Sequence, residues 1–334
     1  MKNKKSFTGC LVGGACGDAL GYEVEFEKMK GIKRKFGIHG ITDFNLNEGV
    51  ALISDDTQMT LFTAAGLLAG SNSEIYIKSI WASYKDWYQT QIVDPVYKPY
   101  TELYKIKALH SRRAPGNTCL TSLRLSENGG SIESPINMSK GCGGIMRVAP
   151  IGLSDISDEP YINGMLGAEA AALTHGHPLG YIPAGCMADI IHRIVFGEEK
   201  PLLLNITDSV SATVSVFKDI PSINEFQELM MKAVFLSGYD MDDTDAIRQL
   251  GEGWIAGETL AIAIYSCLKY RDDFKKAIIC AVNHDGDSDS TGSVAGNILG
   301  SYLGIDMVNE SFSTSYLELY ELIIGYAEAL YDKK

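Results

Sequence analysis

The chain has 334 residues, 46% of them hydrophobic, and its formal net charge at pH 7 is −13. This acidic balance argues against non-specific binding to nucleic acid and against attachment to anionic membranes, because both need a basic surface. No apolar run approaches the ~20 residues that would span a bilayer. The seven cysteines form no CxxC pair, so no zinc site is predicted, and we expect reduced, buried thiols in a cytoplasmic protein.

The N-terminal stretch 1–21 begins with lysines and continues with small residues, and so has a superficial likeness to a signal peptide. Its apolar run is short, glycines interrupt it, and Asp18 follows. The pattern therefore does not favour secretion.

Helical periodicity dominates the chain from residue 54 onward. In the segment 54–69, Met59, Phe62 and Ala65 share one face, and Ser54 is suited to cap the N-terminus. Further helices are predicted at 74–88, 162–174, 180–196, 223–236, 256–270, 273–282, 291–303 and 313–331. Strands and helices do not alternate, so the sequence predicts one all-α domain over residues 1–334, with ten or more helices.

Two acidic clusters occur at the starts of predicted helices. The first is SDDT, residues 54–57. The second is NHDGDSDSTG, residues 283–292, with aspartates at positions 285, 287 and 289. Each cluster alone is typical of a helix N-terminus, where serine caps the backbone and aspartate complements the helix dipole.

Neither acidic cluster has a cation nearby in the sequence. No Lys or Arg occurs from Phe36 to Ile77, or between Lys276 and Lys333. Buried carboxylates without a cation are costly. If the two helix ends meet in the fold, their carboxylate and hydroxyl oxygens would form a ligand set that suits Mg²⁺, Mn²⁺ or Ca²⁺ and not zinc.

Two known motifs overlap the second cluster. An EF-hand loop beginning at Asp285 needs glycine at its sixth position and glutamate at its twelfth, but these are Ser290 and Gly296, so that motif is excluded. Residues 287–291, DSDST, fit the DxDxT motif of haloacid-dehalogenase-type phosphatases. That motif normally ends a strand early in an α/β chain, and here no strand–helix series follows it. A phosphatase is therefore a weak alternative.

Seven motifs resemble those of the ADP-ribosylglycohydrolase family, which includes dinitrogenase-reductase-activating glycohydrolase and ADP-ribosyl-arginine hydrolases. They are GDALGYEVEF (17–26), SDDTQMT (54–60), RAPGNTC (113–119), GCGGIMRVAPIGL (141–153), THGHPLG (174–180), GEGWIAGETLAIAI (251–264) and GDSDSTGSVAGNILG (286–300). Each motif alone is weak, but seven in the family order over most of the chain make a specific match. The family fold is an all-α orthogonal bundle of many helices, in agreement with the helical pattern.

The resemblance implies that two divalent ions, Mg²⁺ or Mn²⁺, lie between the two acidic clusters. The ligands that it implies are Ser54, Asp55, Asp56, Asp287, Asp289 and Ser290. The glutamate of the first motif, Glu25, would contact a metal and act as acid or base, and Asp55 or Asp56 is the second catalytic candidate. Glu23 is the alternative to Glu25, because a small alignment shift would exchange them.

The glycine-rich stretch KGCGGIMR, residues 140–147, resembles the family loop whose backbone N–H groups bind a diphosphate. The substrate-binding residues implied there are Gly141, Cys142, Gly143 and Gly144. Glycines alone are more typical of an ordinary turn. Many family members have asparagine where this chain has Cys142, which removes an amide donor from the loop.

Three further residues are candidates around this loop. The family places the first histidine of THGHP, His175, near the bound ribose or phosphate, although a buried structural histidine is the more common case. Lys140 and Arg147 are candidates to add positive charge.

The resemblance implies a hydrolase that cleaves the glycosidic bond between ADP-ribose and its target, with arginine on a modified protein as the favoured linkage. Serine linkages, free ADP-ribosyl compounds and nucleic-acid adducts are the alternatives, and the acidic surface disfavours the last. Such cleavage passes through an oxocarbenium-like transition state. Divalent cations can hold the ribose hydroxyls, and a nearby carboxyl group can exchange protons. The alternatives are a catalytically silent relative that binds ADP-ribose, which the intact acidic clusters disfavour, and the DxDxT phosphatase.

Overall fold

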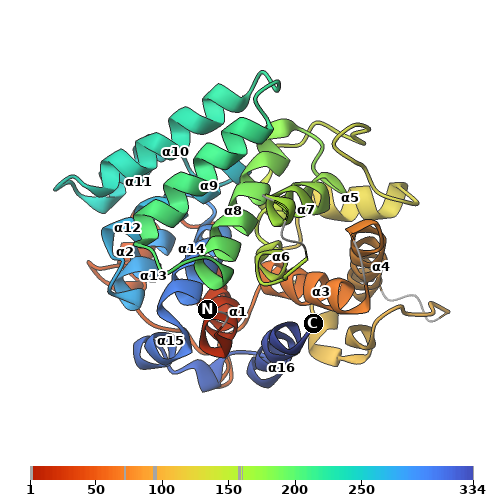
Figure 1. The fold of residues 1–334 in the computed structure, drawn as a ribbon. Coiled ribbons are helices and arrows are strands. Elements are labelled where there is room, and N and C mark those ends of the chain that lie inside the picture. Colours follow the sequence, from red (N-terminus) through yellow and green to blue (C-terminus); the bar gives the residue numbers. More distant parts are fainter. Residues whose placement is uncertain (1–2, 71–72, 93–95, 157–158, 160, 334) are drawn as a thin grey trace.

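The computed structural model describes residues 3–70, 73–92, 96–156, 159 and 161–333. In these residues the chain forms sixteen α-helices and four 3₁₀ turns, and the β-type pairings are three isolated bridges. The α-helices are α1 (Lys4–Tyr22), α2 (Met29–Phe36), α3 (Asp55–Ala69), α4 (Ser73–Ile92), α5 (Asn117–Leu125), α6 (Ala149–Gly152), α7 (Ile162–Ala172), α8 (Pro178–Phe196), α9 (Leu202–Val216), α10 (Ile223–Ser237), α11 (Asp243–Leu250), α12 (Ala256–Lys269), α13 (Phe274–Val282), α14 (Ser288–Leu303), α15 (Ile305–Ser311) and α16 (Tyr320–Asp332). The all-α prediction is confirmed, and Figure 1 shows helices crossing in several directions around α1, α8 and α14.

Most predicted helices lie within a few residues of observed ones, namely α3, α4, α7, α8, α10, α12, α13 and α14. The prediction for 313–331 was too long, because the backbone turns at Leu319, whose φ is 61°, and α16 begins only at Tyr320. Helix α1 was missed. Its residues 7–21 are all buried, so it has no polar face and gives no helical periodicity to read.

Glycines at four-residue intervals bring α1 and α14 together as an antiparallel pair. The paired positions are Gly9 with Gly300, Gly13 with Gly296, Gly17 with Gly292 and Gly21 with Ser288. A Cβ atom at Gly17 would lie 1.9 Å from the carbonyl oxygen of Gly292, so only glycine permits this backbone contact. As a result, the residues that follow α1 lie beside the acidic residues that begin α14.

We expect Gly17→Ala to lower the free energy of unfolding by about 3 kcal/mol, the upper end of the usual cost of overpacking a core. The new methyl group would meet the rigid backbone of Gly292, not a movable side chain. Gly325→Ala is the matched control, because it lies in α16 with no atom within 4 Å of the added Cβ. That control should gain up to about 1 kcal/mol from helix propensity. Urea unfolding of both variants measures the difference, and equal stabilities would contradict the packing described.

Helix α8 is long and apolar enough to cross a bilayer by length and composition, with a mean hydropathy of 1.2 over its best 18-residue window. However, 78% of that window is buried inside the fold. It packs against α6, α7, α9, α12 and α14, as a central helix of a bundle does.

Candidate active site

Three helix ends meet at one cavity: the end of α1, the start of α3 and the start of α14. Asp18, a fully buried residue of α1, holds the start of α3 in place. Its carboxylate accepts hydrogen bonds from the backbone N–H groups of Ser54 (3.0 Å) and Thr57 (3.1 Å) and from the Thr57 hydroxyl. These hydrogen bonds fix the start of α3, and with it the first acidic cluster, against α1, which packs on α14.

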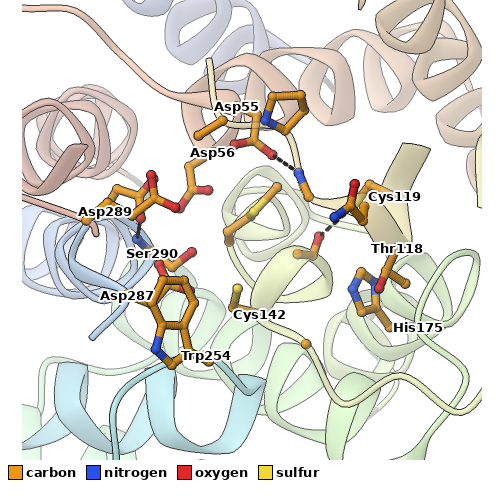
Figure 2. Close-up of a pocket in the computed structure, with 18 of the residues that line it drawn as sticks. Asp55, Asp56, Thr118, Cys119, Cys142, His175, Trp254, Asp287, Asp289 and Ser290 are labelled. Atoms are coloured by element: carbon orange, nitrogen blue, oxygen red, sulfur yellow. Dashed lines mark hydrogen bonds between the residues drawn. The ribbon is translucent and has the colours of Figure 1, made fainter. Parts of the chain in front are cut away.

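The cavity has a volume of about 540 Å³. Its lining residues include Glu25, Asp55, Asp56, Arg112, Cys119, Gly141, Cys142, Gly143, His175, Trp254, Asp287, Asp289 and Ser290. Figure 2 shows the two acidic clusters facing each other at one end, with His175 at the other end and Cys142 between them. Segments more than two hundred residues apart in the sequence therefore converge as predicted.

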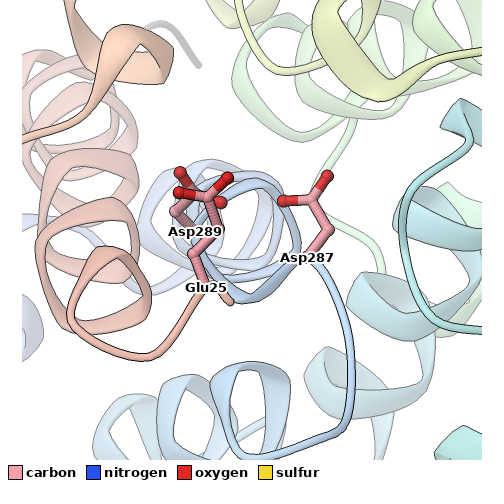
Figure 3. A group of neighbouring side chains, drawn as sticks. All are labelled: Glu25, Asp287 and Asp289. Carbon is pink, nitrogen blue, oxygen red and sulfur yellow. The ribbon is translucent and has the colours of Figure 1, made fainter. Parts of the chain in front are cut away.

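Glu25, Asp287 and Asp289 form the tightest acidic group. Each offers one carboxylate oxygen, and these three oxygens lie within 4.8 Å of one another. Figure 3 shows the three carboxyl groups turned toward a shared space at the start of α14. All three side chains are buried, so water does little to screen their repulsion.

Burial and mutual repulsion raise the pKa values of the carboxyl groups in this cavity. Burial first, and then the charges of Asp289 and Asp287, raise the pKa of Glu25 to about 10. Burial and the charge of Asp289 also raise the pKa values of Asp55 and Asp56 well above their usual range. So many carboxyl groups can be ionised together only if a positive charge joins them.

The donor atoms fit a hard divalent cation. Glu25 Oε2 and Asp56 Oδ2 are buried without a hydrogen-bond partner among the described residues. Arg112 is the only Lys or Arg among the described residues that line the cavity, against five carboxyl groups. Mg²⁺ and Mn²⁺ prefer carboxylate and hydroxyl oxygens of this kind.

Three acidic or hydroxyl residues that the sequence analysis singled out make their contacts outside the cavity. The hydroxyl of Ser54 accepts a hydrogen bond from Asp56 N (3.1 Å) and caps α3, and Ser54 does not line the cavity. Asp285 accepts from Met29 N (2.7 Å) at the start of α2. Glu23 pairs with Lys35 (3.3 Å), whereas Glu25 lines the cavity. The geometry therefore favours Glu25 over Glu23 as the catalytic candidate.

The glycine-rich loop turns one side toward the cavity. Gly141, Cys142 and Gly143 line it, whereas Gly144 packs away from it, with an added Cβ 3.0 Å from Ala171 Cβ. Cys142 N donates to Trp254 O (3.2 Å), so this N–H is already used within the protein. The N–H groups at the start of a helical turn lack partners within that turn, which leaves Gly143 as the better backbone donor for a ligand.

The Cys142 side chain is turned toward the second acidic cluster. Its thiol lies beside Asp287, whose charge adds to burial in raising the pKa of the thiol well above its usual range. All seven cysteines are free thiols, and six of them are buried, as predicted. Arg147 differs from the sequence interpretation: it is fully buried and does not line the cavity.

Sequence reasoning missed the aromatic pair at the edge of the cavity. Phe26 and Trp254 both line it, and their rings stack with centroids 6.0 Å apart and an interplanar angle of 21°. Phe26 is 73% exposed. Both residues lie inside motifs that carry the family resemblance, but no periodicity or charge pattern marks them as neighbours.

The phosphatase alternative is not supported by the fold. Helix α13 ends at Val282, a short loop over 283–286 precedes DSDST, and Ser288 begins α14. Residues 274–303, all of them described, contain no strand on which a DxDxT nucleophile could be placed.

Comparisons with known proteins agree with this geometry. The family model described as ADP-ribosylglycohydrolase matches residues 1–334. The ADP-ribosyl-[dinitrogen reductase] glycohydrolase of Rhodospirillum rubrum is 25% identical over 306 residues, which cover 89% of this chain and 85% of that protein. ADP-ribosylhydrolase ARH3 of Homo sapiens is 28% identical over 199 residues, which cover 53% of this chain and 54% of that protein. A solved structure titled ADP-ribosylglycohydrolase-related protein complex has a TM-score of 0.64 at 22% identity and covers 98% of this chain and 97% of its own, which shows a shared fold.

Proposed function

The chain belongs to the ADP-ribosylglycohydrolase family, whose members hydrolyse glycosidic bonds to ADP-ribose, and from that premise we propose that it is a metal-dependent hydrolase that removes ADP-ribose from arginine side chains of a modified protein. The observation that carries the proposal is the convergence of Glu25 and two acidic clusters on one cavity beside a glycine-rich loop. A protein target is further supported by the relative from Rhodospirillum rubrum, whose name specifies an ADP-ribosylated protein.

We propose that Glu25 handles the proton. Burial and the charges of Asp289 and Asp287 raise the pKa of Glu25 to about 10, and a bound cation would lower this pKa toward the range in which the side chain can both give and take a proton. Protonated Glu25 can donate to the leaving nitrogen as the bond to the ribose carbon breaks. The carboxylate so formed can then accept a proton from the water that attacks this carbon, which restores Glu25.

We propose that the two acidic clusters hold two divalent ions, Mg²⁺ or Mn²⁺. The residues that would bind them are Asp55, Asp56, Asp287, Asp289 and Ser290, which line the cavity, whereas Ser54, the sixth ligand that the resemblance implies, caps α3 outside it. When bound, such ions supply Lewis-acid chemistry and hold the vicinal hydroxyls of a ribose. Asp55 is the second candidate for proton transfer. It accepts a hydrogen bond from Gly116 N (3.3 Å), which orients its carboxylate within the cavity.

The family resemblance, and not the charge of the cavity, carries the choice of arginine as the leaving group. Five carboxyl groups and one arginine line the cavity, and two bound divalent ions would balance this negative charge. The opposite end, with Gly143 and His175, is proposed to bind the diphosphate.

We expect the purified protein with Mg²⁺ to release ADP-ribose faster from an arginine-linked peptide than from a serine-linked peptide of the same sequence. EDTA should abolish both reactions, because the proposed ligand set is then empty. Measuring released ADP-ribose by chromatography tests the proposal. A faster reaction on the serine-linked peptide would contradict the arginine assignment.

Tight binding of ADP-ribose without release from either peptide would instead support a catalytically silent binding protein. An aryl phosphate serves as the negative control, and we expect no phosphate to be released from it.

A further inference from the structure

Arg147 is an unusual buried residue. Its side chain is completely buried, and among the described residues no Asp or Glu forms an ion pair with it. Its guanidinium carbon lies 4.3 Å from the ring centre of Tyr84, and Nη2 donates to Ala170 O (3.2 Å) and to Thr174 Oγ1 (2.7 Å). Nη1 contacts Cys119 Sγ (3.4 Å) and Met59 Sδ (3.6 Å). A buried charge without a counter-charge is costly, so these hydrogen bonds and the ring contact are what stabilise Arg147 in the core.

The contact with Thr174 determines where the hydroxyl proton can go. A guanidinium group only donates hydrogen bonds, so Thr174 Oγ1 must be the acceptor in its contact with Arg147. The hydroxyl proton of Thr174 is then available for a second partner. His175 Nδ1 lies 2.8 Å from Thr174 Oγ1, both residues are buried, and the Cys119 thiol is the competing acceptor.

The direction of this second bond sets the tautomer of His175. If Nδ1 accepts the proton of Thr174, the imidazole of a neutral histidine carries its own proton on Nε2. Burial, and then the positive charge of Arg147, lower the pKa of His175 to about 3, so the ring is neutral at physiological pH.

Nε2 faces the glycine-rich loop of the cavity. A Cβ atom added at either Gly141 or Gly143 would lie 3.3 Å from His175 Nε2, so side chains at these positions would crowd this nitrogen. Among the described residues, no protein atom forms a hydrogen bond with Nε2. The donor is therefore left for a ligand.

We propose that Arg147 and Thr174 are positioning residues that fix His175 as the neutral tautomer with its proton on Nε2, so that it donates a hydrogen bond to a diphosphate oxygen of the ligand. The identity of the ligand rests on the function proposed above, whereas the tautomer does not. Arg147 thus acts on the ligand through two other residues, without entering the cavity.

Nitrogen-15 NMR of the Mg²⁺-loaded protein tests the proposal directly. In wild type at neutral pH, we expect His175 to show a protonated Nε2 and an unprotonated Nδ1, with the resonances assigned by comparison with His175→Gln. A proton on Nδ1 in wild type would overturn the proposal without any variant. Addition of ADP-ribose should shift the Nε2 resonance.

Thr174→Val removes the hydroxyl at nearly constant volume, and Thr174→Ser keeps it as the matched control. We expect Thr174→Val to move part of the proton population of His175 to Nδ1 and to weaken ADP-ribose binding about tenfold, the value of one hydrogen bond to a charged group. Thr174→Ser should retain the wild-type tautomer and affinity. An unchanged tautomer in Thr174→Val would overturn the positioning role.

The two proposals fail in different ways. A wild-type protein that has the expected tautomer but does not bind ADP-ribose would contradict the proposed function and support the positioning of His175. A wild-type protein that binds ADP-ribose with His175 protonated on Nδ1 would contradict the positioning of His175 and agree with the proposed function.

Discussion

Glu25→Gln is expected to lower kcat on an ADP-ribosyl-arginine peptide by about 10²–10⁴-fold, the usual contribution of a general acid or base. Glutamine has nearly the same shape as glutamate and can fill the same space beside Asp287 and Asp289. It has no proton to donate to a leaving nitrogen, and it cannot accept one from water. KM should change much less than kcat, because the lost interaction belongs to the transition state.

Glu23→Gln is the control for this variant, because it lies two residues away and pairs with Lys35 and Asn45 outside the cavity. It should retain nearly all activity. The comparison is made from initial rates at saturating Mg²⁺, with circular dichroism to verify folding. A Glu25→Gln enzyme with wild-type kcat would remove Glu25 from the mechanism.

Asp289→Asn should have opposite effects on stability with and without metal. The charge of Asp289 raises the pKa values of Glu25, Asp55, Asp56 and Asp287, so its removal relieves repulsion in the metal-free protein. In EDTA the variant should therefore unfold at the same temperature as wild type or a higher one. With Mg²⁺, wild type should gain about 3 kcal/mol at a hundredfold excess over Kd, and the variant should gain little.

The neighbouring Asp285→Asn variant controls for a general loss of acidic charge, because Asp285 contacts Met29 N outside the cavity. It should respond to Mg²⁺ as wild type does. Loss of a direct ligand should weaken metal binding by more than the about 10–100-fold that loss of an outer-shell partner costs. Differential scanning fluorimetry across a Mg²⁺ series measures these responses. An equal stabilisation of wild type and Asp289→Asn would contradict the assignment of Asp289.

The family resemblance implied the convergence of the two acidic clusters, and the lack of nearby cations in each cluster explained why a metal would then be needed. Sequence reasoning could not predict what holds the clusters together. Asp18 reads as an ordinary residue near the end of a small-residue stretch, and its partners Ser54 and Thr57 are 36 and 39 residues away. The pairing of α1 with α14 could not be predicted either, because a helix buried on all sides lacks the polar face that marks amphipathic helices.

The glycine-rich loop illustrates a different limit. Its glycines and the nearby Arg147 appear in the sequence as a possible anion site, and the residue type alone suggests a direct charge contact. In the structure Arg147 is fully buried and reaches His175 only through Thr174. Whether a charged side chain faces a cavity or the core depends on tertiary packing, which no local pattern encodes.

The central claim is that the acidic clusters at the starts of α3 and α14, together with Glu25, bind divalent cations. The most direct measurement is anomalous diffraction at the manganese edge from crystals of this protein soaked in Mn²⁺. We predict two anomalous peaks in the cavity, between Asp55 and Asp56 on one side and Asp287 and Asp289 on the other. Saturating Mn²⁺ with no peak between these residues would contradict the account.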